Sequence, residues 1–293
     1  MNGDWLRTMI AVVDEGSFEA AADELRISAS AVSQRIKALE GYLGQVMVRR
    51  TLPCAPTPAG EALLRMARQV VFLEDETLAE LGRGHAGALL RVAVNADSLA
   101  TWFRPVLREA AAWEGLTLRL QVEDQGHSSE LLRRGDVIAA VTSDPVPVAG
   151  CRTELLGAMR YVPVAAPELL ARHGGLAALD WARLPALRYN AKDDLQLDFL
   201  RHKGITSIPP QPQVPGSEAF LAGVLAGLAW GMIPEAQLGD QVREGSLVRL
   251  PGEPVDVPLH WQVWRVDSPR IERATLAVRR AARGLAPVGG SEK

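Results

Sequence analysis

Cysteine is scarce in this chain, and long apolar runs are missing. The only two cysteines, Cys54 and Cys151, lie far apart and in different predicted domains, which argues against a disulfide framework and favours a reducing compartment. No stretch approaches the roughly 20 apolar residues that a membrane-spanning helix needs. The N-terminus has acidic residues early and no basic segment followed by an apolar core, so no signal peptide is predicted. We therefore expect a cytoplasmic protein without membrane contact.

The motifs of common enzyme classes are also missing. The five histidines show no His-Glu-x-x-His or other metal-ligand spacing. No Walker loop, Gly-x-Ser-x-Gly or Gly-x-Gly-x-x-Gly motif follows a predicted strand. Cys151 has no evident base beside it in the sequence, so a small core thiol is the favoured interpretation. We predict that the chain is not an enzyme and has no catalytic residue, metal site or cofactor.

Two short amphipathic segments between Ser17 and Arg50 meet at a tight corner. Apolar residues recur at helical spacing in both: Phe18, Ala21, Ala22 and Leu25, then Val32, Ile36, Leu39 and Leu43. Ser28 is placed to cap the second helix. A helix from Asp4 to Glu15, with Asp4 as its N-cap, is predicted to pack behind both.

The polar face of the second helix has the chemistry of a DNA reader. Ser30, Ser33, Gln34 and Lys37 share one face, and hydroxyl, amide and ammonium groups suit base edges and phosphates in a major groove. A solvated helix face is the alternative interpretation. Residues 45–50 are predicted to form a short β-wing whose Arg49 and Arg50 contact the phosphate backbone, a solvated turn being the alternative. Two further residues of the helical segment are assigned to DNA: Ser28 and Arg35.

A long helix follows this domain. Thr57 is placed to cap it and Pro58 to begin it, and it is predicted to run to about Leu81. Its apolar residues keep the 3-4-3 spacing of a coiled-coil seam: Leu63, Met66, Val70 and Leu73. Packing within its own domain is the alternative, but dimerisation is favoured, because one reading helix covers only half a site. We predict residues 1–58 as the DNA-binding domain and residues 59–87 as a linker helix and hinge.

From Leu89 onward, short apolar strands alternate with helices. Strands are predicted at 89–94, 116–122 and 137–141, with helices at 98–113 and 129–134 between them, which indicates a parallel α/β sheet. Weaker strands are expected at 159–164, 186–189, 213–215, 231–233 and 257–263, and helices at 167–172, 195–203 and 217–228. A last helix begins at Ser268-Pro269. The fold class is α/β behind an all-α winged helix-turn-helix. Residues 88–293 are predicted as two α/β lobes, about 88–160 with 268–287, and 161–267.

Polar residues gather where the predicted strands end, which is the edge at which open sheets bind ligands. The candidates are Asn95, Asp97 and Ser98; Glu123 and Asp124; Thr142, Ser143 and Asp144; and Ser217 and Glu218. Five of them are carboxylates, which favours a cationic ligand, although two or three would line the site if the others are merely solvated. The Ser98 hydroxyl and nearby helix amides are expected to meet a ligand carboxylate, so the set fits an amino acid with a basic side chain.

Several motifs resemble a known family. Ala20-Ala21-Ala22 with Leu25, residues 30–37, and Pro56-Thr57-Pro58-Ala59-Gly60 resemble the winged helix-turn-helix and linker entry of LysR-type transcriptional regulators. Residues 94–102, 120–124 and 217–220 resemble the ArgP/LysG subgroup. The resemblance covers nearly the whole chain and is weakest between Gly174 and Gln213. Ala29 stands where the family usually carries Gln.

The resemblance implies a regulator that senses lysine or arginine and activates an amino-acid exporter gene. Its effector domain would have the fold of periplasmic binding proteins. Its partners would be double-stranded DNA, RNA polymerase, L-lysine or L-arginine, and further copies of itself in a dimer or tetramer. Two alternatives remain open at this point. One is a solute-binding protein for a cationic amino acid, and the other is a LysR-type regulator that responds to a different small effector.

Overall fold

Three helices and a small sheet form the N-terminal domain in the computed structural model, which describes residues 1–81, 88–123 and 128–288. They are α1 (Gly3–Asp14), α2 (Phe18–Leu25), α3 (Ala29–Leu43), β1 (Val48–Arg49) and β2 (Ala55–Pro56). The two strands pair antiparallel. The predicted apolar stripe of the second segment faces inward, because Val32, Ile36 and Leu39 are buried in the domain core. The result is a helix-turn-helix followed by a short wing.

Side-chain caps decide where these helices begin. Asn2, rather than the predicted Asp4, caps α1, and its Oδ1 accepts a hydrogen bond from the Asp4 N–H at 2.8 Å. Ser17 caps α2 and Ser28 caps α3. Arg26 ends α2 in the left-handed conformation, with φ of 54°, which turns the chain sharply into α3.

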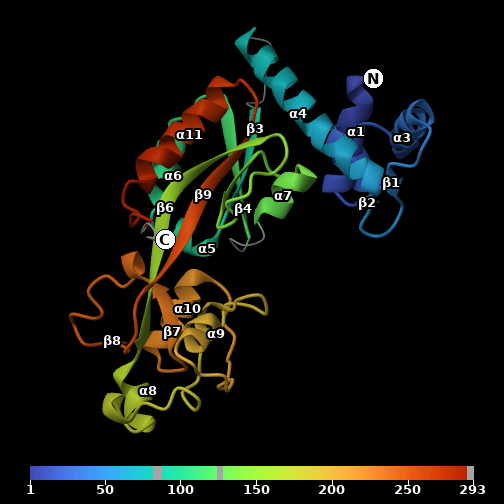
Figure 1. Ribbon diagram of the computed structural model, residues 1–293. Helices are drawn as coiled ribbons and strands as arrows, with labels where there is room; N and C mark the ends of the chain where they lie inside the picture. Colours follow the sequence, from blue (N-terminus) through green and yellow to red (C-terminus); the bar gives the residue numbers. More distant parts are fainter. Residues whose placement is uncertain (82–87, 124–127, 289–293) are drawn as a thin grey trace.

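The long helix α4 (Pro58–Glu80) leaves this domain and reaches the top of the second domain (Figure 1). Thr57 caps it as predicted, since its Oγ1 accepts a hydrogen bond from the Gly60 N–H at 3.0 Å. Leu64 and Ala67 are buried against the N-terminal domain and its neighbours, whereas Val70 and Leu73 of the predicted seam remain exposed. In the described part of the chain, Leu63 of the same seam packs against the N-terminal core, so the exposed part of the seam is its later end.

A seven-stranded sheet forms the second domain. Its strands are β3 (Ala88–Val94), β4 (Leu116–Val122), β5 (Ala139–Thr142), β6 (Cys151–Ala165), β7 (Gly231–Pro234), β8 (Val248–Arg249) and β9 (Val255–Trp264). The order is β4-β3-β5-β9-β6-β7, with β8 paired to β6. The predicted parallel pairing holds for β3, β4 and β5. The sheet as a whole is mixed, because β9 runs antiparallel to both β5 and β6.

Helices cover this sheet in two lobes (Figure 1). The helices of the upper lobe are α5 (Ala96–Ala100), α6 (Arg104–Ala110), α7 (Ser128–Arg134) and α11 (Pro269–Ala282). Those of the lower lobe are α8 (Pro167–Arg172), α9 (Leu195–His202) and α10 (Ser217–Leu225), with the 3-10 turns η1 (Leu176–Ala178) and η2 (Glu235–Gln237). The long strands β6 and β9 pass through both lobes and join them. The lobes therefore share one continuous pair of strands as their hinge.

Two predicted elements take a different form. The single helix expected over 98–113 is two helices, because the chain turns at Thr101 and Pro105 supplies no N–H to continue the earlier helix. The strands expected at 186–189 and 213–215 are reduced to isolated bridges, Ala186 with Trp230 and Arg188 with Gln213. In the part of the chain that the structure describes, no helix is both long and apolar enough to cross a membrane.

Candidate ligand cleft and nucleic-acid interface

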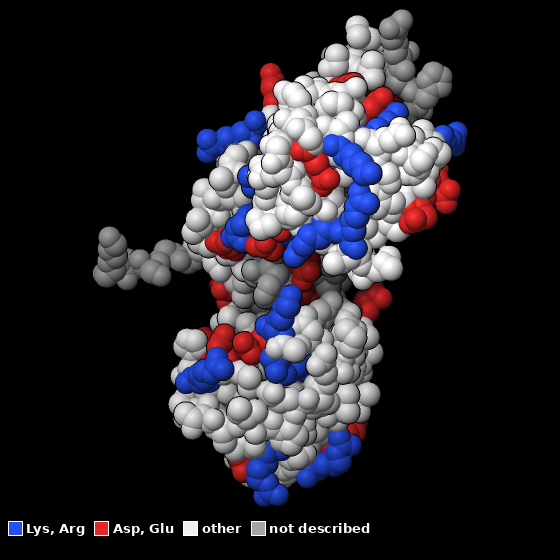
Figure 2. All heavy atoms as spheres, turned by 90° about the vertical axis from the view of Figure 1, so that its right-hand side faces the viewer, with Lys and Arg blue, Asp and Glu red and all other residues white. Residues whose placement is uncertain are grey.

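One face of α3 is free for contact with another molecule. Ser30, Gln34 and Lys37 are exposed on it and Ser33 is partly exposed, while the opposite side of the helix is buried. Ser28 lies at its start, where its Oγ both caps the helix and lies 3.0 Å from the Ser30 Oγ. Figure 2, which faces the N-terminal domain, shows basic side chains in an arc across this side of the molecule, with acidic side chains beside them.

The arginines predicted to contact DNA have different surroundings. Arg49 and Arg50 are exposed at the wing, and the Arg50 guanidinium stacks over the Phe18 ring, 4.9 Å from its centroid. Arg35 lies apart from the reading face. Its guanidinium reaches back to α1, 3.3 Å from an Asp4 carboxylate oxygen and 3.4 Å from the Thr8 hydroxyl. Arg35 therefore joins α3 to α1 in this structure.

A cleft lies between the two lobes of the second domain. It encloses about 620 Å³ of empty space, part of it open to solvent. Both lobes and the hinge strand β6 contribute lining residues: Asn95, Ala96, Asp97, Glu123, Tyr161, Tyr189, Asp193, Leu195, Gln196, Ser217, Phe220, Met232, Ile233, Pro234 and Gln237.

Asp97 is the point at which the lobes meet. It follows β3, within α5, and its Oδ2 accepts a hydrogen bond from the Tyr161 hydroxyl at 2.9 Å. Its Oδ1 accepts one from the Ser217 hydroxyl at 2.6 Å, and Ser217 is the first residue of α10 in the lower lobe. Gln237 completes the group by donating from Nε2 to the Ser217 carbonyl at 3.2 Å. One carboxylate thus holds the upper lobe, the hinge strand and the lower lobe together.

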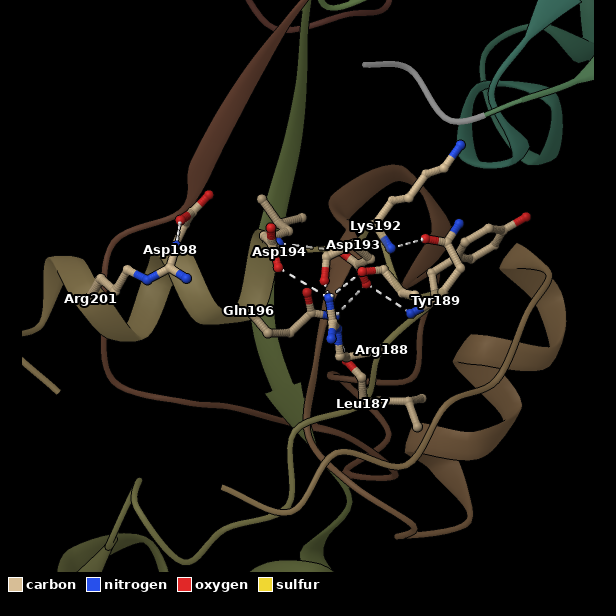
Figure 3. Close-up of polar contacts among 12 residues, drawn as sticks. Leu187, Arg188, Tyr189, Lys192, Asp193, Asp194, Gln196, Asp198 and Arg201 are labelled. Atoms are coloured by element: carbon tan, nitrogen blue, oxygen red, sulfur yellow. Dashed lines mark hydrogen bonds and ion pairs between the residues drawn. The ribbon is translucent and has the colours of Figure 1, made fainter. Parts of the chain in front are cut away.

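The loop between Arg188 and Gln196 forms the lower wall of the cleft (Figure 3). Arg188 holds its backbone by donating to the carbonyls of Asp193 at 2.8 Å and Ala191 at 2.9 Å. The Asp193 carboxylate accepts from the Tyr189 N–H at 2.8 Å and the Leu195 N–H at 3.2 Å. These bonds fix the loop in one conformation, so Tyr189 and Asp193 are presented to the cleft by a preorganised support.

A single lysine stands at the mouth of the cleft. The Lys192 ammonium lies 4.0 Å from a Glu123 carboxylate oxygen, and the pair connects the lower loop to the end of β4 in the upper lobe. Figure 3 shows the Lys192 side chain extended away from its loop, toward the upper lobe. Three carboxylates line the cleft (Asp97, Glu123 and Asp193), and no lysine or arginine is among the described lining residues. The cleft is therefore suited to a cation.

The structure brings four of the predicted ligand residues to the cleft and leaves five of them outside it. Asn95, Asp97, Glu123 and Ser217 line it. Asn95 also caps α5, with its Oδ1 accepting from the Ser98 N–H at 3.2 Å. Ser98 is fully buried behind the cleft, where its Oγ accepts a hydrogen bond from the Trp102 indole at 2.9 Å. The Ser98 hydroxyl is thus committed to the core of the upper lobe.

Of the other four, three lie at the end of β5 and in the turn after it, and Glu218 pairs with the opposite lobe. Thr142 is buried, and its Oγ1 accepts a hydrogen bond from the Asp144 N–H at 3.1 Å. The Asp144 carboxylate accepts one from the Val146 N–H at 2.9 Å. These two bonds order the turn after β5, which includes Ser143. The Glu218 side chain is 83% exposed and lies 3.4 Å from Arg104 outside the lining. Asp124, also predicted, lies outside the described residues.

Several lining residues were not predicted from the sequence. Tyr161 lies within the long strand β6, and Tyr189, Asp193 and Gln196 lie in or beside the Arg188 loop, where no periodic pattern marks an element. The one available signal was the run Asn-Ala-Lys-Asp-Asp from Asn190 to Asp194, which is typical of a turn and carries charge. The pairing of strands and loops, rather than a local motif, brings these residues to the cleft.

Comparison with known proteins places both parts of the chain in one family. Residues 4–61 match the model for the bacterial regulatory helix-turn-helix protein, lysR family, and residues 83–286 match that for the LysR substrate binding domain. The chain is 46% identical to the lysine export transcriptional regulatory protein LysG of Corynebacterium glutamicum over 290 residues, 98% of this chain and 100% of LysG.

Two solved structures are similar over the full length. The crystal structure of ArgP from Mycobacterium tuberculosis is 44% identical, with a TM-score of 0.86 over 99% of this chain and 100% of ArgP. Full-length LysG from Corynebacterium glutamicum with bound effector Arg is 45% identical, with a TM-score of 0.80 over 98% of this chain and 100% of that one.

Proposed function

This chain belongs to the LysR family of transcriptional regulators, and we propose that its interlobe cleft binds a basic amino acid, L-lysine or L-arginine, as the effector that controls transcription. The observation that carries the proposal is the convergence of three carboxylates, Asp97, Glu123 and Asp193, on one cleft between the lobes. A ligand with two cationic groups neutralises such a cleft, whereas a neutral or acidic ligand leaves the carboxylates repelling one another. The arginine bound as effector in the LysG structure has the same chemistry.

The remaining groups of the ligand also find partners. α10 begins at Ser217 with no side-chain cap, so the N–H groups of its first turn are available to an α-carboxylate. Leu195, Phe220 and Met232 line the cleft and suit the methylene stem of lysine or arginine. We assign the α-ammonium to Asp97 and the side-chain cation to Glu123 and Asp193.

The N-terminal domain supplies the DNA contacts in this proposal. The exposed face of α3 would read base edges through Ser30, Ser33, Gln34 and Lys37, and Ser28, Arg49 and Arg50 would contact the backbone. The exposed residues Val70 and Leu73 of α4 would pair with a second copy, because a symmetric operator needs two reading helices. Such dimers, or tetramers built from them, would activate an amino-acid exporter gene by recruiting RNA polymerase in the cytoplasm.

Isothermal titration with three ligands tests the effector. L-Lysine and L-arginine should bind, and L-norleucine, which keeps the apolar stem but lacks the side-chain cation, should bind at least tenfold more weakly, because it cannot form the charge-assisted contacts to Glu123 and Asp193. Fluorescence anisotropy with the DNA upstream of the protein's own gene should show that lysine or arginine changes DNA affinity. Equal binding of norleucine and lysine would overturn the assignment of the carboxylates, and a failure to bind either basic amino acid would overturn the effector class.

A further inference from the structure

A cluster of charges around one buried arginine lies where the DNA-binding domain, the linker helix and the effector domain meet. At its centre is Arg68 of α4, whose side chain is only 6% exposed. Its Nη1 donates to the Asp136 carboxylate at 2.6 Å, and its Nη2 donates to the Asp14 carboxylate. Asp14 is the last residue of α1, and Asp136 follows α7 in the upper lobe. One guanidinium therefore binds a carboxylate from each of the two domains.

Two more arginines support the same carboxylates. Arg91 of β3 donates to the second oxygen of Asp14 at 2.8 Å, and the Arg134 Nε lies 3.2 Å from the second oxygen of Asp136. The planar guanidinium of Arg68 presents two separate nitrogens in fixed directions, one to each carboxylate, whereas a lysine would have to reach both carboxylates from a single nitrogen. Because each carboxylate has a second arginine, removal of the Arg68 charge would leave neither carboxylate without a partner. A variant at Arg68 is therefore expected to fold.

The backbone around this cluster is closely packed. A Cβ on Gly135, where φ is +74°, would lie 2.8 Å from the Arg65 Cα, so α4 touches the turn between α7 and β5 directly. Arg65 donates to the Arg133 carbonyl at 2.9 Å, and farther along α4 Glu76 accepts from the Ser268 hydroxyl at 2.7 Å. The linker helix is thus held along the upper lobe, and Arg68 contacts both the upper lobe and the DNA-binding domain, the latter at Asp14, which Arg91 of the upper lobe also contacts.

The cluster is connected to the cleft through one strand. Arg91 lies on β3, and the same strand leads directly into Asn95 and Asp97, which line the cleft. β5, which begins shortly after Asp136, pairs with β3. Asp136 and Arg91 therefore move when the upper lobe changes its orientation. If the ion pairs of the cluster persist, Asp14 and the DNA-binding domain move with them.

We infer that Arg68 is a positioning residue that couples the effector cleft to the DNA-binding domain of the same chain. By holding Asp14 and Asp136 together, it makes the orientation of the reading helix depend on the orientation of the upper lobe. Without Arg68 the cleft still binds its ligand and α3 still binds DNA, but ligand binding no longer changes DNA affinity. The inference rests on the proposed function only for the identity of the ligand that is used to measure the coupling.

Arg7 offers a matched control. It lies on α1 and pairs with two carboxylates, Glu74 at 3.1 Å and Asp75 at 2.7 Å, both on α4. Arg7→Gln therefore removes an ion pair between the same two helices without removing a contact to the effector domain. A general weakening of the α1–α4 interface would appear in both variants, whereas loss of the interdomain link would appear only in Arg68→Gln.

The test measures the ratio of DNA affinities with and without saturating L-lysine in the full-length protein, alongside lysine affinity by calorimetry. Arg68→Gln should keep both separate affinities within about threefold of wild type and bring the ratio close to one, while Arg7→Gln keeps the wild-type ratio. Arg68→Lys should also bring this ratio closer to one, because a single ammonium nitrogen replaces the two guanidinium nitrogens that bond Asp136 and Asp14 separately. A wild-type ratio in Arg68→Gln, or an equal loss in Arg7→Gln, would overturn the inference.

A second readout does not depend on any effector. Spin labels on cysteines introduced at Ala38 of α3 and Glu114 of the upper lobe, in chains diluted with unlabelled protein, report the distance between the domains of one chain. Arg68→Gln should broaden this distance distribution, and Arg7→Gln should not. An unchanged distribution in Arg68→Gln would contradict the positioning role even if lysine and arginine do not bind. Conversely, a broadened distribution without amino-acid binding in the wild type would contradict only the proposed effector.

Discussion

At the scale of single residues, Asp97 shows how a cleft can close on a cation. Its two carboxylate oxygens receive hydrogen bonds from Tyr161 on the hinge strand and from Ser217 on the lower lobe. A carboxylate has about four lone-pair sites, so an ammonium group can join these donors rather than displace them. Binding of a cation at Asp97 and closure of the lobes around it therefore favour each other.

Glu123→Gln should weaken the binding of L-lysine by about tenfold or more, because a charge-assisted contact to the side-chain ammonium is lost. Asp144→Asn is the matched control, since Asp144 is another carboxylate that follows an upper-lobe strand but lies outside the cleft. Titration calorimetry measures both. Unchanged affinity in Glu123→Gln, or an equal loss in Asp144→Asn, would remove Glu123 from the proposed site.

Lys192→Gln should have the opposite effect. The Lys192 ammonium lies beside Glu123 at the mouth of the cleft, where it competes with the cation of the ligand. The pair is 4.0 Å apart and largely solvated, so its removal should raise lysine affinity by only about two- to fivefold. A decrease in affinity would instead show that Lys192 binds the carboxylate of the ligand.

Ser98→Ala should reduce stability and leave ligand affinity unchanged. The Ser98 hydroxyl is buried and accepts the Trp102 indole N–H, so its removal leaves that donor without its partner. The expected loss is about 1–3 kcal/mol in the free energy of unfolding of the effector domain. Denaturant unfolding measures it, and calorimetry with lysine shows whether the cleft is affected. A large change in lysine affinity without a loss of stability would return Ser98 to the binding site.

At the scale of elements, α4 combines two roles that its apolar pattern does not separate. Leu63 of the predicted seam packs against the N-terminal core, while Val70 and Leu73 of the same seam are 42% and 40% exposed. One part of the stripe therefore packs on the chain's own domains, and the other is available to a second copy. Periodicity identified the helix, but only the positions of the neighbouring elements show which residues they cover.

Leu73→Glu should dissociate the proposed dimer. Symmetry places the substituted residue in both copies, so two carboxylates would enter one apolar seam, and the dissociation constant should rise by at least about a hundredfold. Light scattering after size-exclusion chromatography measures the mass. Leu176→Glu, at an exposed leucine on η1, is the control. A dimer that persists in Leu73→Glu would place the interface elsewhere.

The elements that were hardest to predict are those that form the cleft. β6 spans Cys151–Ala165, yet only its later half has a continuous apolar pattern, because its earlier half is partly exposed. The Arg188 loop has no periodicity, since its conformation depends on side-chain bonds to backbone carbonyls. The mixed character of the sheet also depends on contacts between distant segments. Alternation of strands and helices predicts parallel neighbours, but β9 returns from the other lobe and pairs antiparallel with β5.

At the scale of the whole molecule, the reader of DNA and the sensor of the ligand lie in different domains joined by α4. An effector can act on DNA binding only through its different affinity for two arrangements of these domains. Interlobe contacts such as Asp97 with Ser217 and Arg104 with Glu218 belong to the arrangement described here. The Arg68 cluster extends that arrangement to the N-terminal domain.

Thermodynamic reciprocity gives a test at this scale. If lysine changes DNA affinity by a given factor, typically about 5- to 150-fold in coupled systems, DNA must change lysine affinity by the same factor. Titration of lysine into the free protein and into the saturated protein–DNA complex measures the second factor. Unequal factors would show that lysine or DNA also shifts the oligomeric state.

The linear sequence alone determined the helix-turn-helix, the linker helix and the strands β3 and β4. In each of these, local periodicity and capping residues such as Ser28 and Thr57 agree with the final structure. It also indicated a cationic ligand, through the carboxylates that follow the strands. These features depend on residues a few positions apart, and short-range geometry is nearly the same in any fold.

Only the tertiary structure decided which polar residues face the cleft. Ser98 and Asp97 are neighbours in sequence, yet one is buried against Trp102 and the other reaches Ser217, 120 positions away. Likewise, Asp14, Arg68 and Asp136 carry no common motif and meet only because α1, α4 and the upper lobe pack together. A contact between distant residues depends on the direction of each side chain after packing, and local sequence does not set that direction.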